Sequence, residues 1–196
     1  MASESRIFYL MGASGSGKDS LLKQCRSRIT ESDRCFIAHR YITRAPELAG
    51  ENHIWLSEAE FIKRQKLSAF AMHWQANGLY YGIGSEINVW LDQGINVLVN
   101  GSRGYLPQAR ELYHHRLVPL VVCVDADSLE QRLRQRGRES KIQISERIAR
   151  ADRYQQQLDP TILRVDNNQT LEAGTGRLLS VIRQYGSLSG TLADRL

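Results

Sequence analysis

Short apolar runs alternate with helical stretches along this chain, and the alternation predicts strands separated by helices. Each apolar run stops at a glycine or a polar residue, as expected where a buried strand enters a loop. The run at 95–99 is nearly all apolar and β-branched, which is typical of a strand covered on both faces. The predicted strands of this kind are 6–11, 95–99, 117–124 and 162–165.

Helical periodicity fills the intervals between these runs. Strands that alternate with helices form parallel sheets through right-handed crossovers. The predicted fold class is therefore α/β, with a parallel sheet and helices on both faces. The predicted helices begin near 18 and span 57–66, 85–94, 106–116, 128–136, 145–158 and about 171–184.

The stretch from 35 to 74 departs from this regular alternation. Residues 35–41 predict one strand, and a polar turn follows it. Ser57 and Glu60 form a capping-box pattern, so a helix is expected to start at Ser57. Residues 69–74 predict a further strand.

A glycine-rich loop joins the first strand to the first helix. Residues 12–18 match the pattern G-x-x-x-x-G-K in the required strand–loop–helix context. Glycines let backbone N–H groups turn toward phosphate oxygens, and the helix N-terminus adds partial positive charge. Lys18 is then expected to reach the β- and γ-phosphates of ATP. The predicted ATP-binding residues of this segment are Gly12, Ala13, Ser14, Gly15, Ser16, Gly17, Lys18, Asp19 and Ser20.

Asp19 stands where the pattern expects a Ser or Thr that holds Mg²⁺. Its carboxylate is a hard oxygen ligand, but it also adds negative charge beside the phosphates. The alternative is an acidic residue favoured by the positive end of the helix dipole. Metal ligation by Asp19 is therefore a hypothesis, with Mg²⁺ as the expected ion.

Composition narrows the class of protein. The chain has 196 residues, 42% of them hydrophobic and 24% charged, so we expect one domain at 1–185 and a flexible tail at 186–196. No apolar run reaches about eighteen residues and the N-terminus lacks a signal-peptide layout, so neither a membrane span nor secretion is expected. Three scattered cysteines favour reduced thiols in the cytoplasm.

The charge balance favours phosphate-rich ligands. The net charge is +5, and the 26 basic residues comprise 21 Arg and 5 Lys. The planar guanidinium fork matches phosphate oxygens two at a time. Nucleic acid fits this bias as well as a multi-phosphate ligand does, so composition alone leaves both open.

Beyond the phosphate loop, the order of motifs resembles the guanylate kinase family. That family's acceptor-binding segment contains S-x-T-T-R, G-E, E-F and Y-G, and its lid contains R-L-x-x-R-G followed by R-I. The matching residues here are Arg40–Arg44, Gly50–Glu51, Glu60–Phe61, Tyr80–Gly82, Arg132–Gly137 and Arg147–Ile148. The resemblance implies a P-loop NTPase fold with an acceptor-binding insert at about 38–84 and a lid at about 132–150.

The resemblance also implies roles for single residues in transfer of a phosphoryl group from ATP. The residues assigned to charge neutralisation on the transferred group are Lys18, Arg136, Arg147 and Arg150. Those assigned to adenosine are Asp166 or Asn167, with Arg136 against the adenine. Those assigned to the acceptor's phosphate are Arg44 and Tyr81.

Three departures from the family concern the acceptor. Arg40, Met72 and Gly101 stand where guanylate kinases read guanine with a hydroxyl, a glutamate and an aspartate. Methionine and glycine leave the guanine N1–H and amino group without acceptors, at a cost of several kcal/mol in discrimination, roughly. Guanine is therefore not expected as the acceptor.

Cationic and polar groups stand in place of the base-reading set. Residues 100–103 follow the strand at 95–99, where open α/β sheets place ligands. The candidate substrate-binding residues are Arg40, Arg44, Tyr81, Asn100, Ser102 and Arg103. With the runs Gly-Lys-Asp-Ser-Leu-Leu, Gly-Leu-Tyr-Tyr-Gly and Asn-Gly-Ser-Arg, this pattern resembles the ribose 1,5-bisphosphate phosphokinases. That resemblance implies synthesis of 5-phosphoribosyl 1-diphosphate from ATP in phosphonate breakdown, a small phosphorylated sugar as acceptor, and no nucleic acid or membrane partner.

Two other function classes stay open from the sequence. One is a nucleoside monophosphate kinase with an altered base preference, which phosphoryl transfer to a panel of nucleotides distinguishes. The other is a non-enzymatic module, either a guanylate kinase-like scaffold or an arginine-rich RNA binder. The intact loop at 12–18 argues against the scaffold, whereas steeply salt-dependent RNA affinity without ATP turnover would favour the binder.

Overall fold

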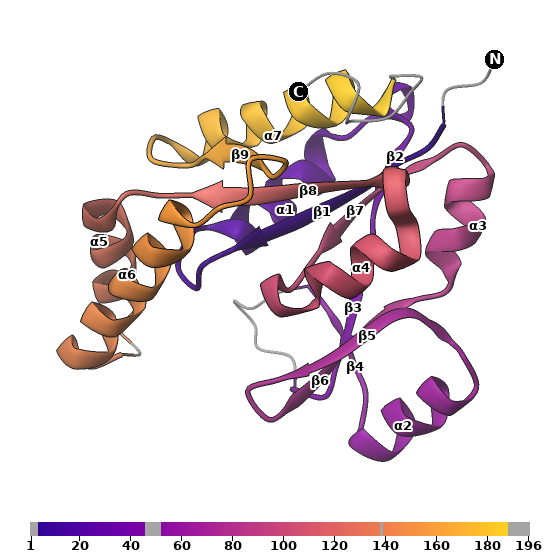
Figure 1. Cartoon of the computed structure of the whole chain (residues 1–196), viewed down its shortest axis with the longest axis horizontal. Coiled ribbons are helices and arrows are strands. Elements are labelled where there is room, and N and C mark those ends of the chain that lie inside the picture. The colour runs from indigo at the N-terminus through magenta and orange to yellow at the C-terminus, as the bar shows by residue number, and fades with distance from the viewer. Residues whose placement is uncertain (1–3, 46–51, 138, 188–196) are drawn as a thin grey trace.

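The computed structural model describes residues 4–45, 52–137 and 139–187. Its centre is a five-stranded sheet in which all paired strands run parallel. β1 lies in the middle of that sheet (Figure 1). The order across the sheet is β2 (Cys35–Ile37), β7 (Asn96–Asn100), β1 (Ile7–Gly12), β8 (Leu117–Cys123) and β9 (Leu163–Asp166).

The side chains of β1 alternate between two apolar layers, as the pleat of a strand requires. Phe8 and Leu10 pack in one layer, and Ile7, Tyr9 and Met11 pack in the other. All five are completely buried, so helices cover both faces and the predicted α/β class is confirmed. The helices of the first layer are α1 (Lys18–Arg28) and α7 (Leu171–Gly186), and those of the second are α3 (Glu86–Asp92) and α4 (Leu106–Tyr113).

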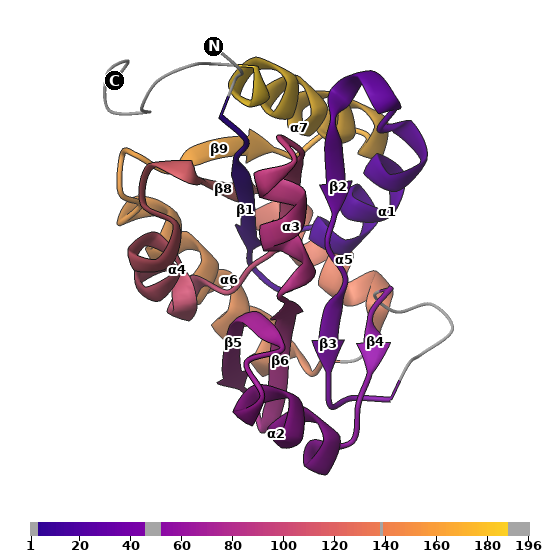
Figure 2. The same ribbon diagram turned by 90° about the vertical axis from the view of Figure 1, so that its right-hand side faces the viewer.

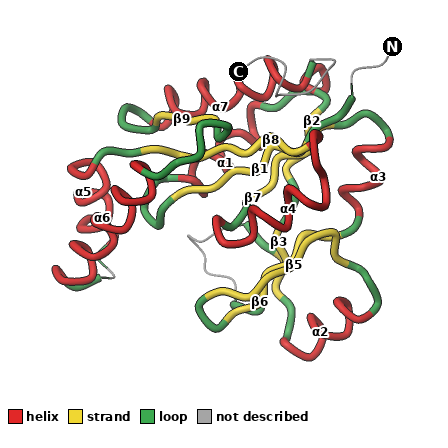
Figure 3. The backbone as a smooth tube through the Cα atoms, in the orientation of Figure 1, coloured by secondary structure: helices red, strands yellow, loops and turns green. Residues whose placement is uncertain are grey.

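A second, four-stranded sheet lies below the main one in Figures 2 and 3. Phe61 of its helix stacks on Phe70 with ring centroids 4.5 Å apart, which fastens the helix to the sheet. The strand order is β4 (Ile54–Trp55), β3 (Arg40–Ile42), β6 (Leu79–Gly84) and β5 (Phe70–Ala76), and the helix is α2 (Glu58–Lys66).

The prediction of one strand at 35–41 is wrong. The segment forms β2 in the main sheet and β3 in the second sheet. Ala38 still donates its backbone N–H to Leu98 of β7, whereas Arg40 already pairs with Ile83 of β6. Both halves are extended, and extension alone does not identify the partner strand, so the sequence pattern does not show the change of sheet.

β6 is absent from the predicted elements because its glycines read as a turn. The structure makes it the partner of β5 through a hairpin at Asn77 and Gly78. Both residues have positive φ, 51° and 73°, which suits a type I′ turn. The Asn-Gly pair is a hairpin signal that the sequence contained.

Two helices stand at the carboxyl end of the main sheet, on the left of Figure 1: α5 (Ala126–Arg136) and α6 (Lys141–Gln156). The predicted start of α6 at 145 is too late by four residues. Ser140 caps the helix by accepting from the Gln143 backbone N–H, and the Gln143 side chain accepts from the Ser140 N–H. No helix among the described residues is both long and apolar enough to cross a bilayer.

Thiol burial leads to a labelling prediction. Cys25 and Cys35 are at most 2% exposed, and burial raises the pKa of each thiol to about 12. Because the thiolate is the reactive form, we expect iodoacetamide at pH 8 to leave both unmodified in the folded protein. Peptide mass mapping checks this, with the urea-unfolded chain as control. Rapid modification of either residue in the folded protein would contradict the prediction.

Candidate functional site

The phosphate loop, residues 12–18, runs from β1 into α1. Gly15 and Gly17 have φ of 91° and 86°, which lets the backbone curve in a way that other residues resist. Ser16 donates its N–H to the Ala13 carbonyl (3.1 Å) and is itself buried. The structure therefore brings the nine predicted residues Gly12 to Ser20 together as one loop and the first turn of α1.

Two side chains from outside the loop hold its backbone. Asn167 Nδ2 donates to the Ser16 carbonyl at 2.7 Å, and Arg132 donates to the same oxygen at 3.2 Å. Arg132 also donates to the Asn167 carbonyl at 2.7 Å. A Cβ at Gly17 would lie 2.5 Å from Asn167 Nδ2, so the glycine makes this close contact possible. Sequence reasoning missed the role of Arg132, although its lid motif contains that residue.

The two residues predicted to contact adenosine lie at the end of β9: Asp166 is its last residue and Asn167 follows it. Asn167 is only 2% exposed, and its side-chain amide donates a hydrogen bond to the backbone of the phosphate loop. Asp166 forms an ion pair with Arg177 at 3.2 Å. Contact with adenosine stays a prediction for both.

Lys18, Asp19 and Asn100 form a polar cluster where β1 and β7 end. Lys18 Nζ donates to Asn100 Oδ1 at 2.7 Å, and Asn100 Nδ2 donates to Asp19 Oδ1 at 3.2 Å. Lys18 Nζ also lies 3.4 Å from Asp19 Oδ1. Burial disfavours the charged carboxylate, but the positive charges of Lys18 and Arg40 and the two hydrogen bonds outweigh it and lower the pKa of Asp19. Asp19 is thus an ionised carboxylate beside the phosphate loop, and its role as a Mg²⁺ ligand stays a prediction.

A stacked aromatic row lines the second sheet on the side of the predicted acceptor. Trp74 lies between Tyr81 and Tyr105, with centroids 5.7 Å and 5.4 Å away. The Arg40 guanidinium lies 5.2 Å from the Tyr81 ring centroid, a cation–π contact. The positive charge of Arg40 also helps to lower the pKa of Asp19. The predicted acceptor residues Arg40 and Tyr81 are therefore linked to the phosphate loop through the electrostatic effect of Arg40 on Asp19. Tyr105 was not among the predicted binding residues.

Arg44 follows β3 and has a hydrogen-bond donor that is not used within the described residues. Its Nε is buried and has no hydrogen-bond partner among the residues that the structure describes. The Arg44 carbonyl accepts from His53 Nε2 at 2.8 Å, which fixes the backbone at this point. A guanidinium whose buried Nε donor is unused suits an anionic ligand.

The loop at 100–103 is held between the main sheet and α6. The Tyr9 hydroxyl accepts from the Ser102 N–H at 2.9 Å and donates to the Ser102 carbonyl at 3.0 Å. The Arg103 guanidinium lies 4.5 Å from the ring centroid of Tyr154, on α6. Arg103 therefore contacts α6 just beyond the predicted lid at about 132–150, and its contact with the acceptor stays a prediction.

Two of the three predicted lid arginines share one carboxylate. Arg136 and Arg147 both pair with Glu139, the second at 3.4 Å. The other oxygen of Glu139 is buried without a hydrogen-bond partner among the described residues. Arg150 is exposed, and among the described residues it forms no ion pair with Glu139. Glu139 is a site residue that sequence reasoning missed.

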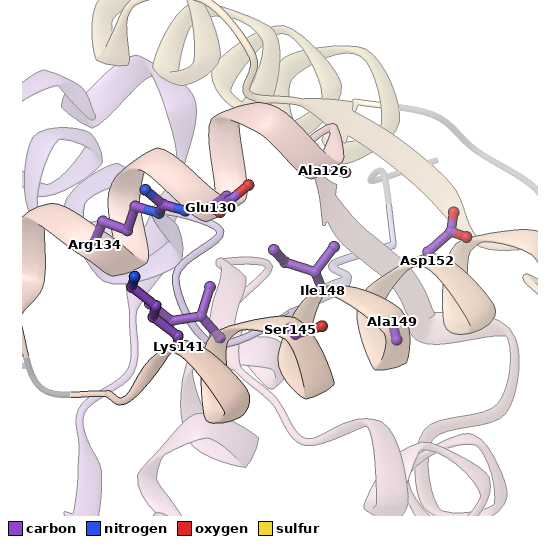
Figure 4. Close-up of a pocket in the computed structure, with 9 residues that line it drawn as sticks. Ala126, Glu130, Arg134, Lys141, Ser145, Ile148, Ala149 and Asp152 are labelled. Carbon is purple, nitrogen blue, oxygen red and sulfur yellow. Dashed lines mark hydrogen bonds and ion pairs between the residues drawn. The ribbon is translucent and has the colours of Figure 1, made fainter.

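Two cavities have linings that contain no residue of the phosphate loop. One of about 340 Å³ separates α5 from α6 (Figure 4). Another of about 660 Å³ lies along β2, near Phe36 and Trp90. Neither lining contains a predicted site residue, so we place the candidate active site by its phosphate loop and charge pattern.

Comparison with known proteins agrees with this geometry. The family model described as guanylate kinase matches residues 4–185. A solved guanylate kinase from Anaplasma phagocytophilum superposes with a TM-score of 0.71 over 96% of this chain and 90% of its own, at 13% identity, which supports the fold.

Curated relatives are closer in sequence. A protein of Yersinia pestis named ribose 1,5-bisphosphate phosphokinase PhnN is 47% identical over 97% of both chains. A protein of the same name from Thiobacillus denitrificans is 52% identical over 78% of this chain and 80% of its own. With the phosphate loop and acceptor-side arginines in place, these matches show that the chain belongs to the guanylate kinase family and, within it, to the ribose 1,5-bisphosphate phosphokinases.

Proposed function

We propose that this protein transfers the γ-phosphoryl group of ATP to ribose 1,5-bisphosphate and forms 5-phosphoribosyl 1-diphosphate, in cytoplasmic phosphonate breakdown. The names of the relatives support this activity. The observation that carries it is the chemistry of the residues predicted to face the acceptor. Arg40 and Arg44 are cationic there, and residues that could read a base are missing. Met72 is completely buried and Gly101 has no side chain, so neither position offers a side-chain acceptor to a purine.

The transfer needs no general base. The phosphate on ribose C1 is already ionised, and one of its oxygens attacks the γ-phosphorus in line. The bond from the γ-phosphorus to the β–γ bridging oxygen breaks, ADP leaves, and a diphosphate remains on C1. The protein's task is to position the two anions and to stabilise the charge of the transition state.

Lys18 and the phosphate-loop backbone supply this stabilisation on the donor side. In the structure Lys18 Nζ is held by Asn100 at 2.7 Å, which keeps the ammonium at the mouth of the loop. Arg136 and Arg147 are held by Glu139. We propose that the lid at about 132–150 brings these two guanidiniums, with Arg150, onto the phosphates when it closes, and that the insert at about 38–84 holds the acceptor.

Mg²⁺, when bound, would supply additional positive charge to the phosphates of ATP. Asp19 fits as its protein ligand because its carboxylate is ionised and lies beside Lys18. Within the described residues, no group of three or more His, Cys, Asp or Glu side chains could hold a metal ion. Phosphate oxygens and water would therefore complete the ligand set.

The proposed ligand role of Asp19 gives a metal-dependence prediction. In Asp19→Asn we expect the Mg²⁺ concentration for half-maximal activity to rise at least about tenfold, because a neutral amide is a weaker ligand than a carboxylate. The control is Asp127→Asn, which removes an acidic residue from the first turn of another helix, α5. An unchanged Mg²⁺ requirement in Asp19→Asn would leave Asp19 as a helix-dipole residue only.

The proposed reaction is tested by an acceptor panel. Purified protein with ATP and Mg²⁺ is given ribose 1,5-bisphosphate, ribose 5-phosphate, GMP or AMP, and ADP release and phosphorylated product are both measured. We expect ribose 1,5-bisphosphate to be preferred over GMP by at least about a hundredfold in kcat/KM, as expected when a site cannot pair the donors of guanine. Preference for GMP would refute the proposal and restore the nucleotide kinase alternative.

A further inference from the structure

The absence of a side chain at position 101 has a steric cause in β1. A Cβ built on Gly101 would lie 2.7 Å from Tyr9 Cδ1 and closer still to Cε1 and Cζ. Tyr9 is completely buried in the apolar layer shared with α3 and α4, so its ring has no room to withdraw. The Tyr9 ring thus occupies the space into which any side chain at 101 would project.

The backbone at Gly101 does not itself require glycine. Its φ lies outside the left-handed region that Gly15 and Gly17 of the phosphate loop adopt. Its N–H donates to the Leu10 carbonyl at 2.8 Å and continues the pairing of β7 with β1. Contact with the Tyr9 ring therefore excludes a larger residue here.

The hydroxyl of Tyr9 then fixes the loop that follows. It uses both its donor and its acceptor capacity on one peptide segment, the N–H and the carbonyl of Ser102. Asn100, on one side of this point, contacts Lys18, and Arg103, on the other, contacts Tyr154 of α6. A single buried hydroxyl therefore holds the loop that contacts Lys18 of the phosphate loop at one end and Tyr154 of α6 at the other.

We infer that Tyr9 is a specificity-determining positioning residue: its ring bars a base-reading side chain at 101, and its hydroxyl sets the 100–103 loop to receive a phosphorylated acceptor without a base. The inference rests on the proposed function for the identity of the acceptor. Tyr9 acts from behind the loop and touches no substrate.

Removal of the hydroxyl is the first test. In Tyr9→Phe the ring stays and two backbone groups of Ser102 lose their partner, so we expect KM for ribose 1,5-bisphosphate to rise about tenfold while KM for ATP changes less than about twofold. Tyr113→Phe is the matched control, because it removes a tyrosine hydroxyl that donates to Asn88 at 2.8 Å outside the site. A purely structural role would lower the melting temperature of Tyr9→Phe and leave both KM values unchanged, and that result overturns the inference.

The steric half is tested by a double-mutant cycle on thermal unfolding, which needs no substrate. Gly101→Ala is expected to lower the melting temperature by several degrees, roughly, and to lower it less when Tyr9 is already alanine. Equal shifts in the two backgrounds would overturn the steric half.

The outcomes separate the two proposals. If ribose 1,5-bisphosphate is used and Tyr9→Phe leaves its KM unchanged, the inference fails and the proposed function stands. If another phosphorylated sugar is the best acceptor, the proposed function fails, and the KM for that sugar decides the inference in the same way. Efficient use of GMP by the unaltered protein would overturn both.

Discussion

Lys18→Met is expected to lower kcat/KM by about a thousandfold, the loss seen when a single preorganised donor to transition-state charge is removed. In the structure Lys18 Nζ is bound to Asn100 at 2.7 Å and lies at the end of the phosphate loop. Methionine is unbranched like lysine and keeps most of the side-chain length, but it removes the charge. The steady-state rate of ADP formation measures the effect, and circular dichroism checks that the fold is kept.

The matched control is Lys23→Met, a change of the same kind on an exposed position of α1. It should retain full activity, because Lys23 lies outside the phosphate loop. A loss in Lys18→Met of less than about tenfold would remove Lys18 from the charge-stabilising set and leave the loop backbone as the main phosphate ligand.

Arg40→Gln is expected to lower kcat/KM for ribose 1,5-bisphosphate by about a hundredfold, because a charge-assisted contact to a phosphate is worth up to about 3 kcal/mol. Arg40 lies over the Tyr81 ring at 5.2 Å and acts on the charge of Asp19. Glutamine keeps a polar end and removes the charge. We expect KM for ATP to stay nearly constant, since the phosphate loop is intact, so initial rates at varied acceptor and fixed ATP isolate the effect.

Arg64→Gln serves as the control for this variant. Arg64 makes the same kind of contact, 5.6 Å from the Tyr41 ring centroid, but from α2. Its loss should leave the acceptor KM unchanged. If Arg40→Gln and Arg64→Gln behave alike, Arg40 is a surface cation of the second sheet and the acceptor's phosphate binds elsewhere.

Local patterns explain which parts of the fold were predictable. β1, the loop at 12–18 and α1 are consecutive, and each carries its own signal: an apolar run, glycines, then helical periodicity. The double-sided burial of β7 follows equally from its composition. The start of α6 was missed because Ser140 and Gln143 form a cap that a search for apolar periodicity overlooks.

The second sheet shows the limit of such patterns. Residues 35–41 look like one strand, although Ala38 and Arg40 bond to different sheets. Strand pairing is a contact between distant segments, and a period of two residues does not state which segment is the partner. The motif resemblance predicts an acceptor-binding insert at about 38–84. The stacked row of Tyr105, Trp74 and Tyr81 depends instead on how β5, β6 and the loop after β7 pack together.

By itself the sequence determined the α/β class, the phosphate loop and a family whose acceptor site has lost its base-reading residues, because these depend on neighbouring residues or on residue chemistry. The tertiary structure alone decided that Asn100 holds Lys18 across 82 positions and that Tyr9 holds Ser102 across 93. It also decided that Glu139 holds two lid arginines. Such contacts arise from how the strands and helices pack. The type of a side chain determines which groups it can bond to, but packing determines which of those groups it meets.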